Sequence, residues 1–306
     1  MKRRIAIIGT GWVGASVAIS TLHSGVADEL LVDDIRKDVA EGEAMDLAHG
    51  ASFYPSTIVR TGTINEMSDA DAIVVAAGRG GRPGESRLEL LRENVAVIRG
   101  IGEQLRGYRG TIVMVTNPVD VLTHVMTSVT GLPSARVVGT GTMLDTARLK
   151  HVIGQLVHID PHSIHALVVG EHGDSEVVLW SAARVAGARL RDWPGWSAER
   201  EPALAEEVRQ AAQQIIRRKG ATNHAIGLVT ADLLRCLLRD ERRVLTVSRV
   251  QEGALGLANV ALSLPTVVGS HGAPDVLEPE MDADERKRLQ HSADVLHRAA
   301  GDAGLT

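Results

Sequence analysis

The sequence has little cysteine, few aromatic residues and little net charge, and each shortage excludes a class of protein. Its single cysteine, Cys236, can form neither an intrachain disulfide nor a thiolate metal cluster, which fits a reducing compartment such as the cytoplasm. Four Trp, two Tyr and one Phe offer few faces on which nucleic acid bases could stack. Because 33 Lys and Arg stand against 38 Asp and Glu, the net charge of −5 indicates no nucleic acid or anionic lipid partner.

Long hydrophobic runs are also missing. Residues 5–27 carry no formal charge and follow the basic residues 2–4, as a secretory signal peptide would, but glycines and polar residues interrupt them. A membrane span needs about 20 predominantly apolar residues, which this stretch does not supply. Two other charge-poor stretches, 110–135 and 253–274, contain internal Pro, Asn or Gly and are predicted to be buried strands joined by turns. A soluble protein with no membrane partner is expected.

What the sequence does contain is an alternation of short apolar runs with helix-length segments. Fully apolar strands alternating with helices predict a parallel sheet covered on both faces, hence an α/β fold with a doubly wound sheet. The predicted strands are 5–8, 30–32, 72–77, 111–115, 136–138 and 164–169.

The pattern changes beyond about residue 140. Residues 202–219 form an amphipathic helical pattern that ends before Gly220, and Asp282 with Glu285 resembles a capping box before a C-terminal helix. The length of 306 residues fits about two domains. We expect a dinucleotide-binding domain over 1–140 and an α+β catalytic, substrate-binding domain over 141–306, in contact with each other.

A glycine-rich turn follows the first predicted strand. The segment 9–14 reads GTGWVG and precedes a helical stretch, which is the context of a Rossmann dinucleotide fingerprint. The glycines permit a tight turn, close approach of the pyrophosphate and close helix packing, and the helix N-terminus offers N–H donors. The residues predicted to contact the cofactor here are Gly9, Gly11, Trp12, Val13, Gly14 and Asp34.

The acidic residue expected to bind the adenosine ribose lies about 20 residues past Gly14. Asp33 and Asp34 end the second strand, and side-chain alternation allows only one of them to serve. A carboxylate there would repel a 2′-phosphate, which favours NAD. The alternative is a glycine turn in another nucleotide-binding or methyl-donor fold.

Four further segments contain residue types suited to binding a substrate that has a carboxylate next to a carbinol. They are AGRGGRPGESR (77–87), TNPVD (116–120), GTGTMLDTAR (139–148) and GEHGD (170–174). In this order and combination the sequence resembles the lactate and malate dehydrogenase family over nearly its whole length, and is most similar to bacterial L-lactate dehydrogenases. The resemblance implies an NAD-dependent L-2-hydroxy acid dehydrogenase. The alternatives are a malate dehydrogenase and a non-catalytic NAD-binding regulator.

The resemblance also implies roles for individual residues. His172 would be the general acid/base, Asp145 would orient and stabilise its imidazolium, and Arg148 would hold the substrate carboxylate with its planar guanidinium. Arg87, in a Gly/Pro-rich stretch, would polarise the substrate carbonyl when that loop closes. From the residues alone, Asp145 could equally be a helix N-cap.

Secondary roles follow from the same resemblance. The side-chain amide of Asn117 would lie near both nicotinamide and substrate, although a turn before Pro118 is the alternative. Ala77 and Gly78 would contact the cofactor, and Thr222 of the KGAT segment would line the substrate pocket.

One position departs from the family pattern. Where lactate dehydrogenases have Gln and malate dehydrogenases have Arg, this chain has Gly81, so no fixed cation stands opposite a second substrate carboxylate. Placing an unpaired carboxylate in a site without water costs on the order of several kcal/mol of binding free energy, which argues against oxaloacetate as the substrate. Arg79 or Arg82 could replace the cation if the glycines let the loop bend. We expect pyruvate/lactate activity that tolerates larger 2-oxo acids.

The resemblance also bears on the effector and on the oligomeric state. Many bacterial members bind fructose 1,6-bisphosphate at a subunit interface through an Arg and a His, and the matching positions are Lys150 and His165. Lys can contact phosphate but lacks the bidentate fork of Arg, so the match is partial. Family members are commonly dimers or tetramers, so a homo-oligomer is expected.

Overall fold

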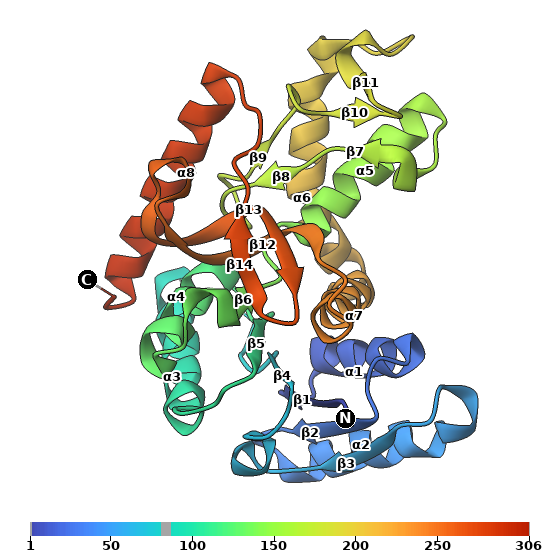
Figure 1. Ribbon diagram of the computed structural model, residues 1–306, viewed down its shortest axis with the longest axis vertical. Coiled ribbons are helices and arrows are strands. Elements are labelled where there is room, and N and C mark those ends of the chain that lie inside the picture. Colours follow the sequence, from blue (N-terminus) through green and yellow to red (C-terminus); the bar gives the residue numbers. More distant parts are fainter. Residues whose placement is uncertain (1, 81–86, 306) are drawn as a thin grey trace.

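The computed structural model describes residues 2–80 and 87–305, without the side chain of Arg87. Within this part the main sheet has nine strands in the order β14-β13-β12-β6-β5-β4-β1-β2-β3 (Figure 1). Strands β1 to β6 pair in parallel, whereas β12, β13 and β14 pair in antiparallel fashion. The sheet strands are β1 (Arg4–Ile8), β2 (Glu29–Asp33), β3 (Ile58–Thr61), β4 (Ala72–Val75), β5 (Thr111–Met114), β6 (Val137–Gly139), β12 (Arg243–Glu252), β13 (Ala258–Gly269) and β14 (Gly272–Val276).

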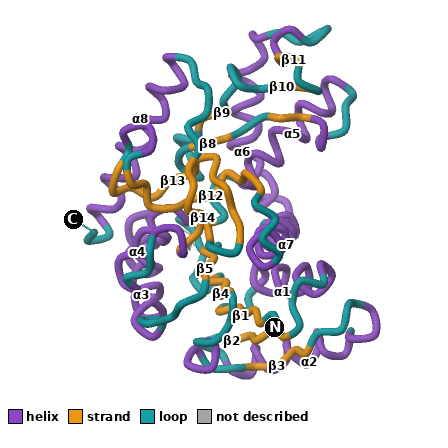
Figure 2. The backbone as a smooth tube through the Cα atoms, viewed as in Figure 1, coloured by secondary structure: helices purple, strands orange, loops and turns teal. Residues whose placement is uncertain are grey.

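Helices cover both faces of this sheet, as the alternation of apolar runs predicts (Figure 2). Helices α1, α2 and α7 pack with one set of strand residues, including Ile5 and Ile7, while α3, α4 and α8 pack with the other, including Ala6 and Ile8. The helices are α1 (Trp12–Ser24), α2 (Lys37–His49), α3 (Arg87–Gln104), α4 (Val119–Thr130), α5 (Met143–Val157), α6 (Glu201–Lys219), α7 (His224–Leu238) and α8 (Ala283–Asp302).

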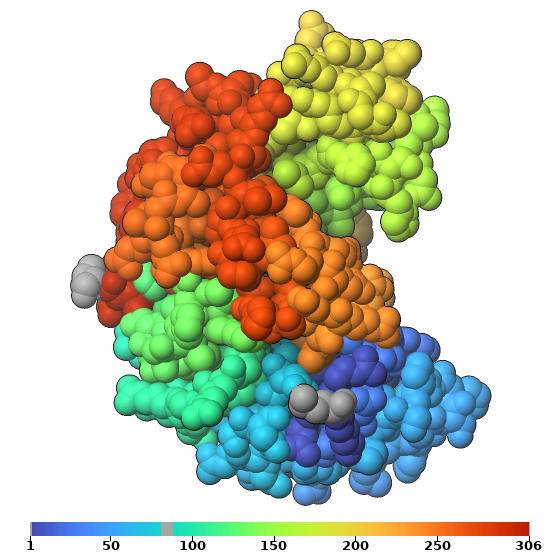
Figure 3. All heavy atoms as spheres, viewed as in Figure 1, coloured from blue at the N-terminus to red at the C-terminus, as the bar shows by residue number. Residues whose placement is uncertain are grey.

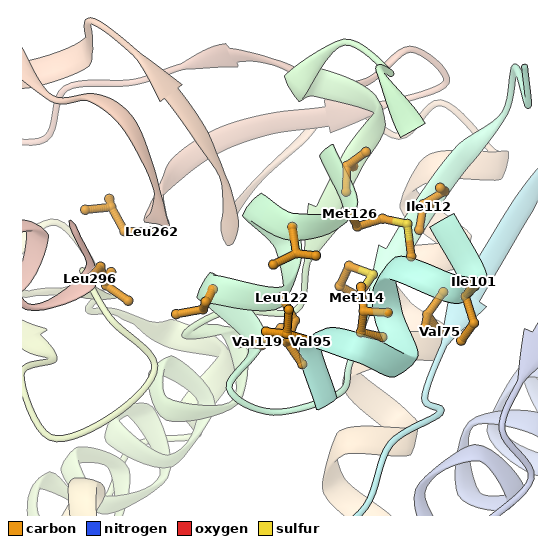
Figure 4. Close-up of a cluster of buried hydrophobic side chains, with 14 of the residues drawn as sticks. Val75, Val95, Ile101, Ile112, Met114, Val119, Leu122, Met126, Leu262 and Leu296 are labelled. Atoms are coloured by element: carbon orange, nitrogen blue, oxygen red, sulfur yellow. The ribbon is translucent and has the colours of Figure 1, made fainter. Parts of the chain in front are cut away.

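The largest hydrophobic core joins the two halves of the chain. Val75, Met114 and Leu122 come from the N-terminal half, and Leu262 and Leu296 from β13 and α8 lie in the same cluster (Figure 4). Fully burying such a side chain stabilises the fold by about 1.5–3 kcal/mol. The two halves therefore share one core and one sheet, and they are in contact over a wide surface (Figure 3).

The second half has a smaller core of its own. It lies between α5, α6 and short strands, with Leu149, Trp180 and Val208 among its members. These strands form a three-stranded sheet, β11-β10-β7, and a two-stranded sheet, β8-β9. Their bounds are β7 (Ile164–His165), β8 (Val168–Val169), β9 (Val177–Val178), β10 (Arg184–Val185) and β11 (Ala188–Arg189).

Two expectations about secondary structure were wrong in part. The stretch 110–135 holds one strand, β5, and then α4, whose residues 119–126 are all buried. This helix buries its polar residues as well as its apolar ones, so the low charge of the stretch indicated burial but not the kind of element. The predicted strand 164–169 is two short strands in different sheets. Strands in 253–274 and the capping box of Asp282 with Glu285 are confirmed.

Candidate active site

The site is organised around the carboxylate of Asp145. One oxygen, Oδ2, lies 2.5 Å from Nδ1 of His172, and the other, Oδ1, accepts a 2.8 Å hydrogen bond from Arg148. Asp145 and Arg148 are three residues apart in α5 and so project from the same side of that helix. Asp145 is almost fully buried, while the side chain of His172 is 23 % exposed. The sequence-based expectation that these three residues converge is confirmed, and the N-cap alternative for Asp145 is wrong because the N-cap is Thr142.

Burial of His172 opposes its positive charge, but the carboxylate of Asp145 outweighs that effect. Asp145, with support from Asp120 and Glu176, raises the pKa of His172 to about 9. Burial likewise opposes ionisation of Asp145, yet His172 and Arg148 together hold the pKa of its carboxyl below the usual range. The free protein therefore holds an imidazolium at neutral pH, with its Nδ1 side turned to Asp145. Such a group is ready to give a proton to a substrate.

The loop that contains His172 is fixed by hydrogen bonds from several elements. Its backbone N–H donates to Oδ2 of Asp120 in α4 at 2.7 Å, and the N–H of Glu171 donates to Ser292 Oγ in α8 at 2.8 Å. The backbone of Gly170 pairs with that of Ser263 in β13. Groups held by both lobes in this way set the position of the imidazole before any ligand arrives.

The glycine-rich turn lies at the carboxyl end of β1 and packs closely on the next strand end. A Cβ on Gly9, whose φ is +98°, would lie 2.5 Å from the backbone N of Ala77, and a Cβ on Gly14 would lie 1.8 Å from the carbonyl oxygen of Gly9. A Cβ on Gly11 would meet nothing within 4 Å. Gly9 and Gly14 thus serve packing, while the open side at Gly11, at the start of α1, leaves room for a ligand. Trp12 and Val13 form the first turn of α1.

The two aspartates after β2 have separate roles. Asp34 Oδ2 accepts hydrogen bonds from the N–H and the hydroxyl of Thr10 in the glycine turn, and Asp34 Oδ1 accepts the N–H of Arg36. These bonds outweigh burial and lower the pKa of Asp34. Asp33 instead pairs with Lys37. Asp34 is therefore the one whose side chain contacts the glycine turn, whereas Asp33 contacts it only through its backbone oxygen, which accepts the N–H of Gly9.

The ends of β4 and β5 connect the glycine turn with the His172 loop. The hydroxyl of Thr116 donates to the carbonyl oxygen of Ala77 at 2.7 Å, and Asn117 follows directly in an exposed position. The amide of Asn94, buried in α3, donates to the carbonyl oxygens of Arg79 and Asn117 and holds these loops together. A Cβ on Gly78 would lie 2.3 Å from Thr116, so this contact requires glycine.

Some predicted site residues lie elsewhere or outside the described part of the chain. Gly81 and Arg82 are among the residues not described, and Arg87 is the first residue of α3. Arg79, which we considered as a replacement cation, is partly buried and pairs with Glu93. Thr222 is half-buried between α6 and α7.

Two acidic residues near His172 were missed by the sequence analysis. Asp120 is buried in α4, and burial raises its pKa to about 6. Glu176 is 6 % exposed and follows the His172 loop directly. Asp120 lies within the motif TNPVD and Glu176 lies two residues after the motif GEHGD, but their burial depends on contacts with residues far away in the sequence. The local signal for their burial is weak: each acidic residue stands next to a valine, Val119 or Val177.

The part of the chain that the structure describes has no group of three or more His, Cys, Asp or Glu side chains placed to hold a metal ion. Over the same residues, each helix is too short or too polar to cross a lipid bilayer.

The arrangement defines a class of protein: a dinucleotide-dependent oxidoreductase in which a buried His–Asp pair handles the proton. Comparison with known proteins narrows this class. Residues 3–139 match the lactate/malate dehydrogenase NAD binding domain, and residues 142–303 match the lactate/malate dehydrogenase alpha/beta C-terminal domain. The chain belongs to the lactate/malate dehydrogenase family and uses NAD.

Individual relatives cover nearly the whole chain. An L-lactate dehydrogenase of Fervidobacterium nodosum is 44% identical over 97% of this chain and 97% of its own length, and one of Priestia megaterium is 39% identical over 96% and 94%. The crystal structure of the minor L-lactate dehydrogenase from Enterococcus mundtii in its ligands-bound form superposes with a TM-score of 0.95 at 35% identity, covering 98% of each chain. The expected α/β fold of Rossmann type is confirmed.

Proposed function

We propose that this protein is an NAD-dependent L-lactate dehydrogenase that interconverts pyruvate and L-lactate. The observation that carries the proposal is the carboxylate of Asp145 shared between His172 and Arg148. A single buried anion thereby aligns a proton donor and a carboxylate-binding cation on neighbouring positions. A 2-oxo acid requires both groups, one for its carbonyl oxygen and one for its carboxylate.

Each residue has a separate role in the proposed reaction. NADH, when bound, supplies the hydride for the carbonyl carbon of the substrate. Arg148 binds the substrate carboxylate, and His172 donates its proton to the oxygen that becomes the hydroxyl; in lactate oxidation it accepts that proton. Asp145 balances the charge of the imidazolium throughout. Arg87 is proposed to polarise the carbonyl, and Asn117 and Thr222 to line the pocket.

The glycine turn fits the pyrophosphate of NAD. Gly11 leaves open space at the N-terminus of α1, where backbone N–H groups lack a side-chain cap. Asp34, ionised beside Thr10, would accept hydrogen bonds from the ribose hydroxyls and would repel a 2′-phosphate. Gly9, Trp12, Val13, Gly14, Ala77, Gly78 and Asn117 complete the proposed cofactor contacts.

The substrate preference is the first prediction. With Gly81 at the specificity position and Arg79 paired with Glu93, we expect pyruvate to be preferred over oxaloacetate by at least about 10-fold, because an unpaired second carboxylate is costly in a dry site. The measurement is kcat/KM with NADH for pyruvate, 2-oxoisocaproate, phenylpyruvate and oxaloacetate. Measurable turnover of the two bulky acids would agree with the missing side chain, and a preference for oxaloacetate would assign the malate dehydrogenase alternative instead.

We also propose that the protein forms a homo-oligomer. Three large apolar side chains are exposed on elements of the N-terminal half, Ile19, Met45 and Phe53, and a fourth, Leu228, is exposed on α7. Helix α1 packs along α7, so Ile19 and Leu228 belong to adjoining elements, and a groove beside α1 is lined by Asp46 and Leu47 of α2. Large apolar side chains exposed on adjoining elements are typical of a subunit interface.

Fructose 1,6-bisphosphate is the proposed effector. Lys150 is half-buried in α5, and His165 is exposed on β7, which packs against α5. Burial, and secondarily Arg243, lower the pKa of Lys150, so an anion would relieve an unfavourable environment. We expect the bisphosphate to lower the KM for pyruvate in the wild type and not in Lys150→Gln. An unchanged KM in the wild type would remove the proposal.

A further inference from the structure

The buried carboxyl of Glu176 is not used by the mechanism above. Its Oε1 is shielded from solvent and has no hydrogen-bond partner among the described residues. A buried carboxylate oxygen without a hydrogen-bond partner costs folding free energy, so its presence calls for an explanation. The side chain lies within electrostatic reach of the Asp145, His172 and Arg148 group and of Arg209 of α6.

Arg209 has a matching feature. Its Nε is also buried and without a hydrogen-bond partner among the described residues, although its terminal nitrogen pairs with Glu206 on the same helix. A cation and a carboxyl, each with a buried unpaired atom, thus interact electrostatically. Helices α5 and α6 pack together, which places Arg209 of α6 on the helix next to that of Asp145 and Arg148.

We propose that Glu176 is a positioning residue whose ionisation, adjusted by Arg209, governs how firmly His172 holds its proton. This inference rests on the proposed function only for its kinetic consequence. The groups that face Glu176 are Asp145 and Arg148 from α5, His172 from its own loop and Arg209 from α6. Those that face His172 are Asp145, Asp120 and Glu176.

The sign of the effect follows from the order of the two titrations. Burial, and next the charge of Asp145, raise the pKa of Glu176 to about 8, against the opposing influence of His172, Arg209 and Arg148. At pH 7 the carboxyl is therefore mostly neutral. Near pH 9, where His172 titrates, it is ionised and stabilises the imidazolium. Glu176 thus keeps His172 protonated at alkaline pH, where the proton donor would otherwise be lost.

The test is Glu176→Gln, which preserves shape and removes ionisation. We expect the alkaline midpoint of kcat/KM for pyruvate reduction to fall by roughly one pH unit, the shift that a nearby charge typically causes. The rate at pH 6.5 should stay within about 2-fold of the wild type, because the wild-type carboxyl is already neutral there. A midpoint that does not move, or a loss of rate equal at every pH, would overturn the proposal and leave a packing role.

Arg209→Met supplies an independent arm. Without this cation Glu176 ionises only at a higher pH. The alkaline midpoint of kcat/KM should therefore fall in Arg209→Met alone, and it should fall no further when Arg209→Met is added to Glu176→Gln. Additive shifts would contradict the proposal. If Glu176→Gln does not fold, the single variant Arg209→Met decides the matter, and an unchanged midpoint in that variant would overturn the proposal. Glu207→Gln, an exposed carboxylate on the same helix, should leave the midpoint unchanged.

An NMR titration of the His172 imidazole, assigned with His172→Asn, separates this inference from the proposed function. It reports proton affinity in the free protein without turnover. A wild type that does not reduce pyruvate would refute the function but leave this titration valid. Equal His172 titration in wild type and Glu176→Gln would refute the inference alone.

Discussion

Replacing His172 with Asn should lower kcat for pyruvate by about 10²- to 10⁴-fold, the usual contribution of a positioned acid/base. Asn can occupy the site and donate a hydrogen bond to Asp145, but it has no proton to transfer at neutral pH. The backbone of residue 172 stays bound to Asp120, and the glycine turn is untouched. The dissociation constant for NADH, measured by fluorescence titration, should therefore remain within about 2-fold of the wild type.

The chain offers a matched control. His162 Nδ1 lies 2.6 Å from Asp160 Oδ1, so this pair has the same chemistry as His172 with Asp145, but its histidine is 96% exposed. His162→Asn should leave kcat unchanged. Turnover above about one tenth of the wild-type rate in His172→Asn would assign the proton transfer to another group, and the absence of turnover in the wild type would favour the non-catalytic regulator.

The chemistry of the site could be predicted from the sequence because each functional residue lies in a short motif next to a strand or helix end. Asp145 and Arg148 share one helical turn, so their convergence needs only local geometry. Which of Asp33 and Asp34 turns its side chain to the glycine turn could not be predicted, because it depends on the contact of Asp34 with Thr10, 24 residues earlier.

Long-range contacts account for what the sequence did not show. Asp120 contacts the backbone of His172 across 52 residues, and the buried Glu176 is influenced by charges of α5 and α6 from elsewhere in the chain. Charged residues in a motif are usually solvated, so nothing in the local pattern predicts a buried carboxyl with a raised pKa.

The continuity of the sheet was missed for a related reason. Strands β12, β13 and β14 extend the N-terminal sheet through a single paired position, Ser248 with Gly139. At Gly139 a Cβ would lie 2.6 Å from Thr123 Oγ1 and 3.0 Å from Ser248 Cβ, so the junction depends on close packing. Apolar alternation predicts that strands exist, but it does not predict which sheet they join.

Replacing Arg148 with Gln should have a comparably large effect by a different route. The variant loses the cation that binds the substrate carboxylate, and charged hydrogen bonds of this kind are worth about 1.5–3 kcal/mol each. For two such bonds we expect kcat/KM for pyruvate to fall by roughly 10²- to 10⁴-fold, mainly through KM. NADH affinity should change little, because Arg148 lies on α5 and not in the glycine turn.

A second measurement distinguishes this effect from simple damage to the site. Arg148 and His172 share the charge of Asp145, so without Arg148 the carboxylate interacts with His172 alone and the pKa of His172 should rise above about 9. The NMR titration of His172 should therefore move upward in Arg148→Gln, opposite in direction to Glu176→Gln. His151→Asn, an exposed change on the same helix, should alter neither KM nor this titration. An unchanged KM in Arg148→Gln would mean that the substrate carboxylate binds elsewhere, and the site would then have to be reassigned around another cation.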